Sequence, residues 1–336
     1  MSVIEAWVGR SAKQPLVRER IDIGPLGAED VEVEVENCGI CHSDLSVLND
    51  DWGLSRYPAV LGHEVIGRIV DVGTAAKGLK VGQHVGIGWN SGSCQYCRPC
   101  KSGSQHLCAQ AQPTIIGHHG GFASRVRSHW SWTIPLPEGL NSAEAGPLLC
   151  GGVTVFNPLV MYAQPTSRVG VVGIGGLGHM GLKFARAYGC DVTAFTSNES
   201  KFDEARGFGA NHVVSSRDSA GMEKVAGTLD LLIVTANVPL DWNVLMATLG
   251  PNGRMHFVGA VQEPVPVSVI PMIFGQRSVS GSPTGSPVAI ETMLDFAARH
   301  NVTPQTEHFP MSQINEAFER LKAGKARYRI VLDADF

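Results

Sequence analysis

The stretch RVGVVGIGGLG, residues 168–178, decides how the second half of this chain folds. Its first five residues form an apolar run typical of a buried strand, and a helical run follows as far as Tyr188. The glycines between them have the spacing G-x-G-x-x-G, which lets a chain turn tightly and point backbone N–H groups at a pyrophosphate. This placement predicts dinucleotide binding rather than glycines chosen only for packing. The predicted contacts are Gly173, Ile174, Gly175, Gly176, Leu177 and Gly178.

Strands and helical runs alternate on the C-terminal side of this turn. The expected strands are residues 192–195, 229–235, 254–258 and 279–281, and the expected helices include residues 201–208 and 290–300. Alternation of this kind is typical of a parallel, doubly wound sheet. A last helix at 314–323 and a last strand at 328–332 are expected to rejoin the N-terminal part of the chain.

The end of the second strand predicts which nicotinamide cofactor is bound. An Asp or Glu at this position would bind the ribose 2′-hydroxyl of NAD(H). This chain has TSNESK at 196–201 instead, in which Thr196, Ser197 and Lys201 can donate hydrogen bonds to a 2′-phosphate. We therefore predict NADP(H). The alternative is that Lys201 only begins the next helix on its solvent side.

The N-terminal half has the pattern of a β-rich module. Residues 31–35 alternate apolar and acidic side chains, as in a half-buried strand, and no long helix is expected before residue 90. Within this module, Cys41 and His63 are candidate ligands of a catalytic zinc ion, which commonly takes Cys and His and keeps one position open. The alternative is a buried thiol and a turn histidine.

Three further residues complete this candidate zinc site. Asp44 and Glu64 are close enough in sequence to the two ligands to orient them. Cys150, in PLLCGGVT at 147–154, is the candidate third ligand, although a lone cysteine in an apolar helix is more often part of a core.

Four cysteines in one short stretch indicate a second metal site. Cys94, Cys97, Cys100 and Cys108 have the spacing C-x2-C-x2-C-x7-C. Four thiolates can close a tetrahedron around zinc, which leaves no open position and gives the metal a structural role. An iron–sulfur cluster is a rival, and reduced cysteines without metal are the remaining alternative.

Length and composition bound the class of protein. The chain has 336 residues, which favours two domains, and we expect them at 1–150 with 290–336, and at 151–289. The formal net charge of −4 gives no electrostatic case for nucleic acid or an anionic membrane. The first ten residues lack the order of a signal peptide, and no apolar run is long enough to span a bilayer. We expect a cytoplasmic protein.

With these motifs in place, the chain resembles the zinc-dependent medium-chain alcohol dehydrogenases, and most closely the cinnamyl-alcohol-dehydrogenase-like branch. The resemblance covers essentially the whole chain in family order. It is carried by GICHSDL, PAVLGHE, the four-cysteine stretch, PLLCGGVTV, GIGGLGH and NEAFERLKAGKARYR. It implies an α/β fold with a GroES-like β-rich catalytic domain and a Rossmann domain. It also implies a homodimer or homotetramer joined through the nucleotide domain.

The resemblance also implies individual roles. Cys41, His63 and Cys150 would bind the catalytic zinc, with Glu64 able to approach the metal. Ser43 would contact the substrate oxygen and the cofactor, Asp44 would lie behind the histidine ligand, and His42 would lie near the pyrophosphate. The other implied cofactor contacts are Thr154, Thr196, Ser197, Lys201, Thr235, Gly259, Ser282 and Thr284. Many relatives have a histidine where this chain has Ser46, so the proton relay would end in water or pass through His42.

The predicted function is interconversion of primary alcohols and aldehydes by hydride transfer with NADP(H). Trp52 and Trp89 are bulky residues at implied pocket positions, so aromatic or medium-chain substrates are favoured, and Pro283 replaces a larger apolar residue. Three alternatives remain open. They are a zinc-free quinone or enone reductase of the same fold, a zinc-ribbon module that binds nucleic acid, and a dinucleotide-binding redox sensor without turnover.

Overall fold

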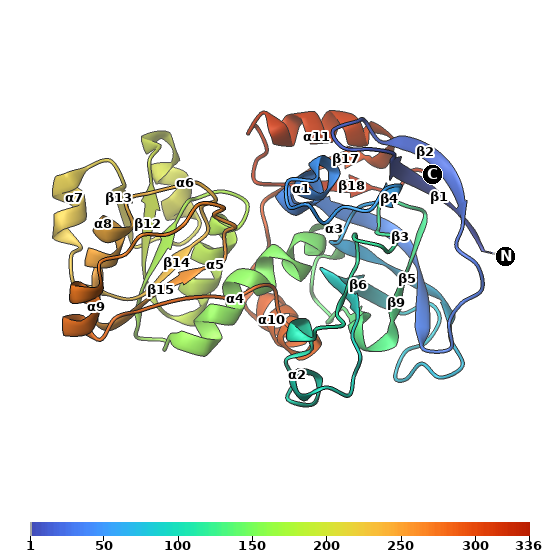
Figure 1. Cartoon of the computed structure of the whole chain (residues 1–336), viewed down its shortest axis with the longest axis horizontal. Helices are drawn as coiled ribbons and strands as arrows, with labels where there is room; N and C mark the ends of the chain where they lie inside the picture. The colour runs from blue at the N-terminus through green and yellow to red at the C-terminus, as the bar shows by residue number, and fades with distance from the viewer. Residues whose placement is uncertain (1) are drawn as a thin grey trace. The chain divides into compact units, whose positions relative to one another are not determined.

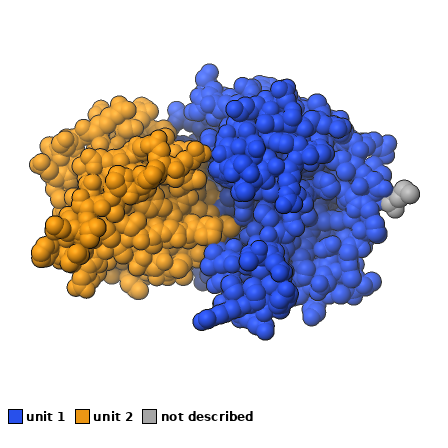
Figure 2. Space-filling model, in the orientation of Figure 1, with its two compact units in different colours: residues 1–150, 285–336 blue, residues 151–284 orange. Residues whose placement is uncertain are grey.

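The computed structural model describes residues 2–336, which form two compact units (Figure 2). Unit 1 contains residues up to Cys150 together with Gly285–Phe336, and unit 2 contains Gly151–Thr284. The chain therefore leaves unit 1 once and returns to it, so that the first and last described segments, drawn in blue and red in Figure 1, both belong to unit 1.

Unit 1 is built on antiparallel strands around β3. A seven-stranded sheet has the order β10-β6-β5-β3-β18-β17, with β9 also pairing with β3, and β2-β1-β4 and β7-β8 form smaller sheets. The strands are β1 (Val3–Gly9), β2 (Val17–Asp22), β3 (Asp30–Ile40), β4 (Ala59–Val60), β5 (Val65–Val72), β6 (His84–Ile87), β7 (Asn90–Gly92), β8 (Gln112–Pro113), β9 (Arg125–His129), β10 (Ile134–Pro135), β17 (Thr306–Pro310) and β18 (Arg329–Asp333).

Short helices connect these strands, and two longer ones follow the return of the chain. They are α1 (His42–Asn49), α2 (Arg98–Lys101), η1 (Gln105–Leu107), η2 (Trp130–Trp132), α3 (Ser142–Ala145), η3 (Gly146–Leu149), α10 (Pro287–His300), η5 (Met311–Gln313) and α11 (Ile314–Lys322). Asn141 is the N-cap residue of α3, but its side chain makes no capping hydrogen bond.

The central strand β3 supports the site because it ends at Ile40, directly before Cys41. Val31, Val33 and Val35 are buried in the core of unit 1. At this same end β3 pairs with β18, with Ile40 opposite Ile330, so the last strand of the chain lies beside the residues that precede the site. A long strand with neighbours on both sides has most of its backbone hydrogen bonds made, which makes it a rigid support.

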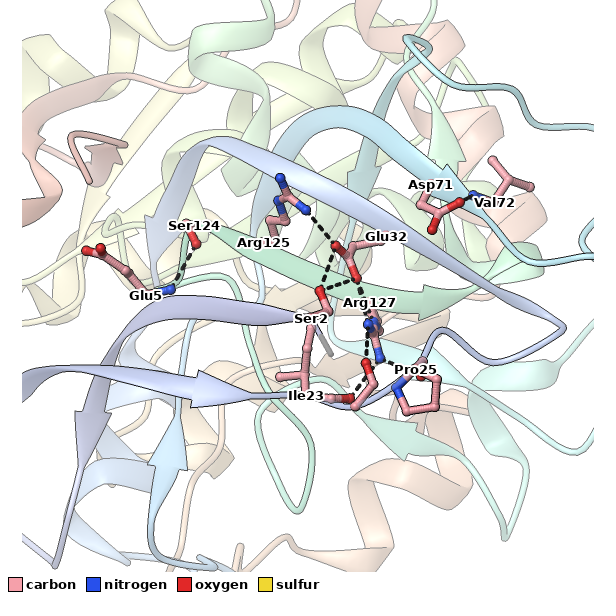
Figure 3. Close-up of polar contacts among 11 residues, drawn as sticks. Ser2, Glu5, Ile23, Pro25, Glu32, Asp71, Val72, Ser124, Arg125 and Arg127 are labelled. Carbon is pink, nitrogen blue, oxygen red and sulfur yellow. Dashed lines mark hydrogen bonds and ion pairs between the residues drawn. The ribbon is translucent and has the colours of Figure 1, made fainter.

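A buried carboxylate links β3 to β9 and to the N-terminus (Figure 3). Glu32 is only 3% exposed, and it accepts hydrogen bonds from Arg125 at 3.0 Å, Arg127 at 2.8 Å and Ser2 at 3.2 Å. Burial alone would raise the pKa of Glu32, but the hydrogen bonds from Arg127 and Arg125 lower it below its ordinary value. Arg127 also donates to the carbonyl oxygens of residues 23–25, so the network is saturated by its own groups.

Unit 2 is a parallel sheet of six strands in the order β13-β12-β11-β14-β15-β16. Its strands are β11 (Arg168–Val172), β12 (Asp191–Thr196), β13 (His212–Ser215), β14 (Leu229–Val234), β15 (Leu249–Phe257) and β16 (Ser278–Gly281). Its helices are α4 (Gly151–Tyr162), α5 (Gly178–Tyr188), η4 (Glu199–Lys201), α6 (Phe202–Gly207), α7 (Ser219–Lys224), α8 (Trp242–Ala247) and α9 (Val269–Gly275). The strand order reverses between β11 and β14, which is where doubly wound folds bind dinucleotides.

Helices cover both faces of this sheet. Trp242 and Leu245 of α8 pack with Met255 on one face. His256 follows Met255 and therefore points to the other face, where its ring lies 5.3 Å from that of Tyr162 in α4. The predicted fold class, a β-rich module with a doubly wound parallel sheet, is confirmed. Among residues 2–336 no single helix is long and apolar enough to cross a membrane, and one bent pair, α3–η3 with α4, passes on length and composition alone.

Candidate active site and nucleotide site

Asp44 organises the candidate zinc site in unit 1. Its carboxylate is fully buried in the first turn of α1. One oxygen accepts the backbone N–H of Cys41 at 2.8 Å, and the other accepts that of Gly62 at 2.9 Å and lies 3.0 Å from Nδ1 of His63. Gly62 has φ +93° and lies against Phe122, so a side chain at this position would clash. One carboxylate thus fixes both loops that carry the predicted ligands.

The predicted ligands meet in three dimensions. Candidate ligand atoms of Cys41, His63, Glu64 and Cys150 all lie within 4.8 Å of one another. Nε2 of His63 is 3.3 Å from Sγ of Cys150, which directly follows η3. The close packing of η3 depends on Gly88, because a Cβ there would lie 2.6 Å from the carbonyl oxygen of Leu149.

The charges of this cluster suit a cation. The contact with Cys150 lowers the pKa of Cys41 well below the ordinary thiol value, and the same contact raises the pKa of Cys150. The two adjacent thiols thus share one negative charge. Deprotonation of the second thiol would require a positive ion beside them. Burial alone would lower the pKa of His63, but Asp44 and Cys41 raise it well above its ordinary value, so a metal ion that binds Nε2 must displace a proton there. Sulfur and nitrogen donors in this arrangement fit zinc.

Glu64 supplies a second observation in favour of a cation. It is fully buried, and one of its oxygens pairs with Arg329 of β18. The other oxygen, Oε2, has no hydrogen-bond partner among the described residues. Burial raises the pKa of Glu64 to about 7, against the opposing effect of Arg329. A buried carboxylate oxygen without a partner is costly, and a carboxylate oxygen of Glu64 lies within 4.8 Å of the ligand atoms of Cys41 and Cys150, so this residue fits a bound cation.

The remaining predicted residues of this site lie around the cluster. Ser43 is half-buried, and its Oγ lies 3.8 Å from Sγ of Cys41. The His63 and Trp89 rings are 4.9 Å apart, and Trp89 contacts Trp52 edge to face at 6.2 Å. His42 is exposed, whereas Ser46 is only 5% exposed. The two tryptophans therefore form an apolar wall beside the cluster, and His42 is accessible to solvent.

The four-cysteine stretch also gathers as predicted. The Sγ atoms of Cys94, Cys97, Cys100 and Cys108 lie within 4.8 Å of one another, with pairs at 3.5, 3.7 and 3.9 Å. Sulfurs bound about 2.3 Å from a single ion in a tetrahedron are about 3.8 Å apart. A multi-iron cluster needs more room than this. No cysteine among residues 2–336 forms a disulfide, so all eight thiols remain available.

The glycine turn of unit 2 has the geometry of a phosphate-binding turn. Gly173 has φ +88°, and a Cβ on Gly178 would lie 2.0 Å from the carbonyl oxygen of Gly173, so both positions require glycine. A Cβ on Gly175 would meet nothing within 4 Å, which leaves open space in front of the turn for a ligand. The hydroxyl of Thr235 donates to the carbonyl oxygens of Val172 and Gly173, so this predicted contact residue holds the turn in shape.

The residues predicted to select the 2′-phosphate follow β12. Lys201 donates from Nζ to the carbonyl oxygen of Ile174 at 2.8 Å, so its ammonium lies against the glycine turn rather than out in solvent. Thr196 is buried and accepts from the backbone N–H of Asn198 at 3.2 Å, while Ser197 is exposed. Positive charge beside a phosphate-binding turn, without an acid at the strand end, fits NADP(H) better than NAD(H).

The other predicted cofactor residues of unit 2 lie in buried or closely packed positions. Thr154, in α4, is 8% exposed. Gly259 follows β15 and lies so close to the backbone of Thr235 and Ala236 that a Cβ would clash. Ser282 and Thr284 follow β16, and Thr284 is also 8% exposed. Because every strand of this sheet is parallel, the segments after β11, β12, β14, β15 and β16 lie at one edge, where open α/β sheets bind ligands.

Two residues with contacts at these sites were not singled out from the sequence. Arg329 pairs with Glu64 across 265 positions of sequence. His256 is fully buried in β15, with hydroxyl partners on or just after β16. The sequence carries no signal for His256, and Arg329 is present only as the last residue of the motif NEAFERLKAGKARYR, without its partner, because both partners are brought in by strand pairing.

Comparison with known proteins identifies the family. Residues 27–138 match the alcohol dehydrogenase GroES-like domain, and residues 176–299 match the zinc-binding dehydrogenase domain. The aldehyde reductase AdhA of Synechocystis sp. is 49% identical over 98% of each chain. A cinnamyl alcohol dehydrogenase structure from Sorghum bicolor has a TM-score of 0.95, with 38% identity over 99% of this chain and 98% of that one. The cinnamyl alcohol dehydrogenase of Helicobacter pylori, complexed with NADP(H), has a TM-score of 0.89 at 29% identity over 98% of each chain.

The chain therefore belongs to the zinc-binding dehydrogenases that carry an alcohol dehydrogenase GroES-like domain. It is an oxidoreductase of this family, and the predicted resemblance is confirmed.

Proposed function

We propose that this protein reduces aldehydes to primary alcohols, and catalyses the reverse reaction, with NADP(H) and a catalytic zinc ion. The observation that carries the proposal is the meeting of Cys41, His63 and Cys150 beside a buried carboxylate oxygen without a partner. The names of its relatives, an aldehyde reductase and an NADP(H)-bound cinnamyl alcohol dehydrogenase, support the same reaction and cofactor.

The proposed zinc ligands are Cys41, His63 and Cys150, with Glu64 as an adjacent acid. Zinc bound there would act as a Lewis acid on the substrate oxygen, and the nicotinamide would exchange hydride with the substrate carbon. Asp44 faces Nδ1 of His63, which fixes the tautomer and leaves Nε2 toward the thiols. The pairing with Arg329 holds Glu64 in place, and its second oxygen would be available to a cation bound beside it.

The proton route is proposed to begin at Ser43. Its hydroxyl lies beside Cys41, and the residue is partly exposed to solvent. The hydroxyl can therefore donate a proton to a substrate oxygen and take up another from solvent. His42 is exposed on the same turn and can exchange protons with solvent. Ser46 is buried in α1, so it cannot pass a proton on to solvent at the end of the proton relay.

Trp52 and Trp89 supply an apolar surface for an aromatic or medium-chain substrate and help exclude water.

Steady-state kinetics on cinnamaldehyde, benzaldehyde and hexanal, each with NADPH and NADH, tests the proposed function. We expect turnover of all three aldehydes and a higher kcat/KM with NADPH. A preference for NADH would overturn the cofactor assignment. Cys41→Ser should abolish turnover and leave NADPH binding nearly unchanged, whereas retained activity would remove zinc from the reaction and favour a zinc-free reductase.

The finer organisation is proposed as well. We infer that residues 1–150 and 290–336 act as the catalytic zinc domain and residues 151–289 as the nucleotide domain. Cys94, Cys97, Cys100 and Cys108 would hold a structural zinc ion that stabilises the lobe from β7 to β8.

Eight free thiols, most of them assigned to metal, suit a reducing compartment, and we propose that the protein is cytoplasmic.

A homo-oligomer joined through unit 2 is the proposed assembly. Four side chains of the short helix α9 are 61–88% exposed although apolar, namely Val269, Ile270, Ile273 and Phe274. β16 lies at the end of the parallel sheet, beside β15, so its outer edge offers unpaired backbone groups. A second copy of the chain would present the same patch and the same edge, as a two-fold interface requires.

A further inference from the structure

His256 lies buried at the β15–β16 end of the sheet in unit 2, and both of its ring nitrogens face hydroxyl groups. Nδ1 is 2.8 Å from Oγ of Ser280, and Nε2 is 2.8 Å from Oγ of Ser282. The ring is 0% exposed. In a neutral imidazole one nitrogen donates and the other accepts, and both roles are filled here by serine hydroxyls. Burial, together with the nearby Arg254, lowers the pKa of His256 to about 4, so the ring is neutral near pH 7.

These two hydrogen bonds restrain the point at which the chain leaves the sheet. Ser280 is the register partner of His256 across β15 and β16. Ser282 is the first residue after β16, and its backbone N–H donates to the carbonyl oxygen of Phe257 at 3.2 Å. The bond from the His256 ring to Ser282 thus adds a side-chain restraint to a residue that one backbone hydrogen bond also ties to β15.

An unsatisfied hydroxyl follows two residues later. Thr284 is 8% exposed, and its Oγ1 has no hydrogen-bond partner among the described residues. Buried hydroxyl groups are nearly always paired, so an exception at the ligand-binding edge of a sheet indicates a group that arrives with the ligand. A dinucleotide lies across this edge with its adenosine ribose at the end of β12. The other half, which carries the nicotinamide, therefore lies over β14, β15 and β16.

We propose that His256 is a positioning residue for the nicotinamide half of the cofactor: it holds residues 282–284 so that the Thr284 hydroxyl hydrogen-bonds the nicotinamide carboxamide. A carboxamide offers both a donor and an acceptor, which matches a hydroxyl in either orientation. The inference rests on the proposed use of NADP(H). A purely structural histidine would stabilise unit 2 without distinguishing the two halves of the cofactor.

Binding of two ligands to the full-length protein separates these roles. NADPH carries the nicotinamide, and 2′,5′-ADP carries only the phosphorylated adenosine half. Kd is measured for each by calorimetry, and NADPH fluorescence gives a second reading. The variants are His256→Asn, whose amide nitrogen can replace Nδ1, His256→Gln, whose amide nitrogen can replace Nε2, and Thr284→Val. Thr248→Val is the control, since it removes a hydroxyl bonded to Leu245 at the opposite end of the sheet.

We expect His256→Asn and Thr284→Val each to raise the Kd of NADPH about 2- to 12-fold, as the loss of one neutral hydrogen bond does. His256→Gln keeps the bond to Ser282 and should stay within about twofold of the wild type, as should the control. No variant should change the Kd of 2′,5′-ADP.

Three results would overturn the inference: equal effects of Asn and Gln at position 256, parallel weakening of both ligands, or an unchanged NADPH affinity in Thr284→Val. If His256→Asn does not fold, Thr284→Val and Ser282→Ala decide the question. Failure of the proposed function is seen separately, because the wild-type protein would then bind no NADPH at all, and the inference would fall with it.

Discussion

At the scale of single residues, Asp44 shows how one buried carboxylate can orient a candidate metal ligand, His63, without being a ligand itself. It holds the N-terminus of α1, the turn at Gly62 and the ring of His63 together. Such a partner of a ligand commonly changes metal affinity by about 10- to 100-fold when it is removed.

Asp44→Asn should therefore lose zinc from the proposed catalytic site. An amide of the same size cannot accept all three hydrogen bonds, and it removes the negative charge behind His63. We expect zinc affinity there to fall about 10- to 100-fold, so that metal analysis after dialysis finds about one zinc per chain instead of about two. Asp71→Asn, at an exposed position of β5, is the control and should keep both. Equal zinc in the two variants would contradict the role given to Asp44.

The two serines of α1 allow the proton route to be tested. Ser43→Ala should lower kcat about 100-fold or more, because a positioned proton donor commonly contributes about 10²- to 10⁴-fold. Ser46→Ala should have little effect, since Ser46 is buried away from solvent. Stopped-flow measurement of NADPH oxidation gives both rates, and the Kd of NADPH should stay unchanged in Ser46→Ala. A larger loss in Ser46→Ala would place the relay inside α1.

At the scale of elements, the buried Glu32 joins β3 to β9 through ion pairs with Arg125 and Arg127 (Figure 3). Glu32→Gln leaves Arg127 without its counter-charge, and we expect a loss of about 3 kcal/mol in the free energy of unfolding at pH 7. Glu34→Gln, two residues along the same strand and exposed, should change it by less than about 0.5 kcal/mol. Urea unfolding of unit 1, followed by tryptophan fluorescence, measures both.

The pH dependence of this difference has a defined sign. The pKa of Glu32 is lower in the folded protein than its ordinary value, so the stabilisation is fully present above the unfolded pKa of about 4.3. It is lost as the pH falls through the lower folded-state value. The gap between wild type and Glu32→Gln should therefore be constant from pH 7 to about pH 5 and shrink below about pH 4. A gap that widens in acid would rule out the ion pairs as its cause.

Elements built from neighbouring residues were predictable from the sequence, and elements that depend on distant pairing were not. The glycine turn lies within six residues from Gly173 to Gly178, and Gly173 and Gly178 each have a local steric reason to be glycine. Helix α1 was not expected, because its N-terminus is fixed by Asp44 rather than by a pattern of apolar residues. Glu64 could be named as an acid near zinc, but its partner Arg329 arrives only when β18 pairs with β3.

At the scale of the whole molecule, the family and the fold class followed from the order of motifs along the chain, because each motif has its own local spacing. The return of the chain to unit 1 at Gly285 depends on the final strand pairing with β3 and β17. Whether copies of the chain assemble depends on the chemistry of the surface and not on these motifs.

The exposed apolar face of α9 makes the proposed assembly testable. Phe274 is 88% exposed and Ile270 is 68% exposed, in a sequence where most large apolar side chains are buried. Charges at both positions would have to be desolvated in an interface, so Ile270→Glu with Phe274→Glu should convert the oligomer to a monomer. Light scattering after size-exclusion chromatography gives the mass against 35.9 kDa for one chain. Val81→Glu, exposed to 62% in unit 1, is the control and should leave the mass unchanged. A wild-type protein that elutes as a monomer would rule out the proposed assembly. A double variant that stays oligomeric would place the subunit contact elsewhere.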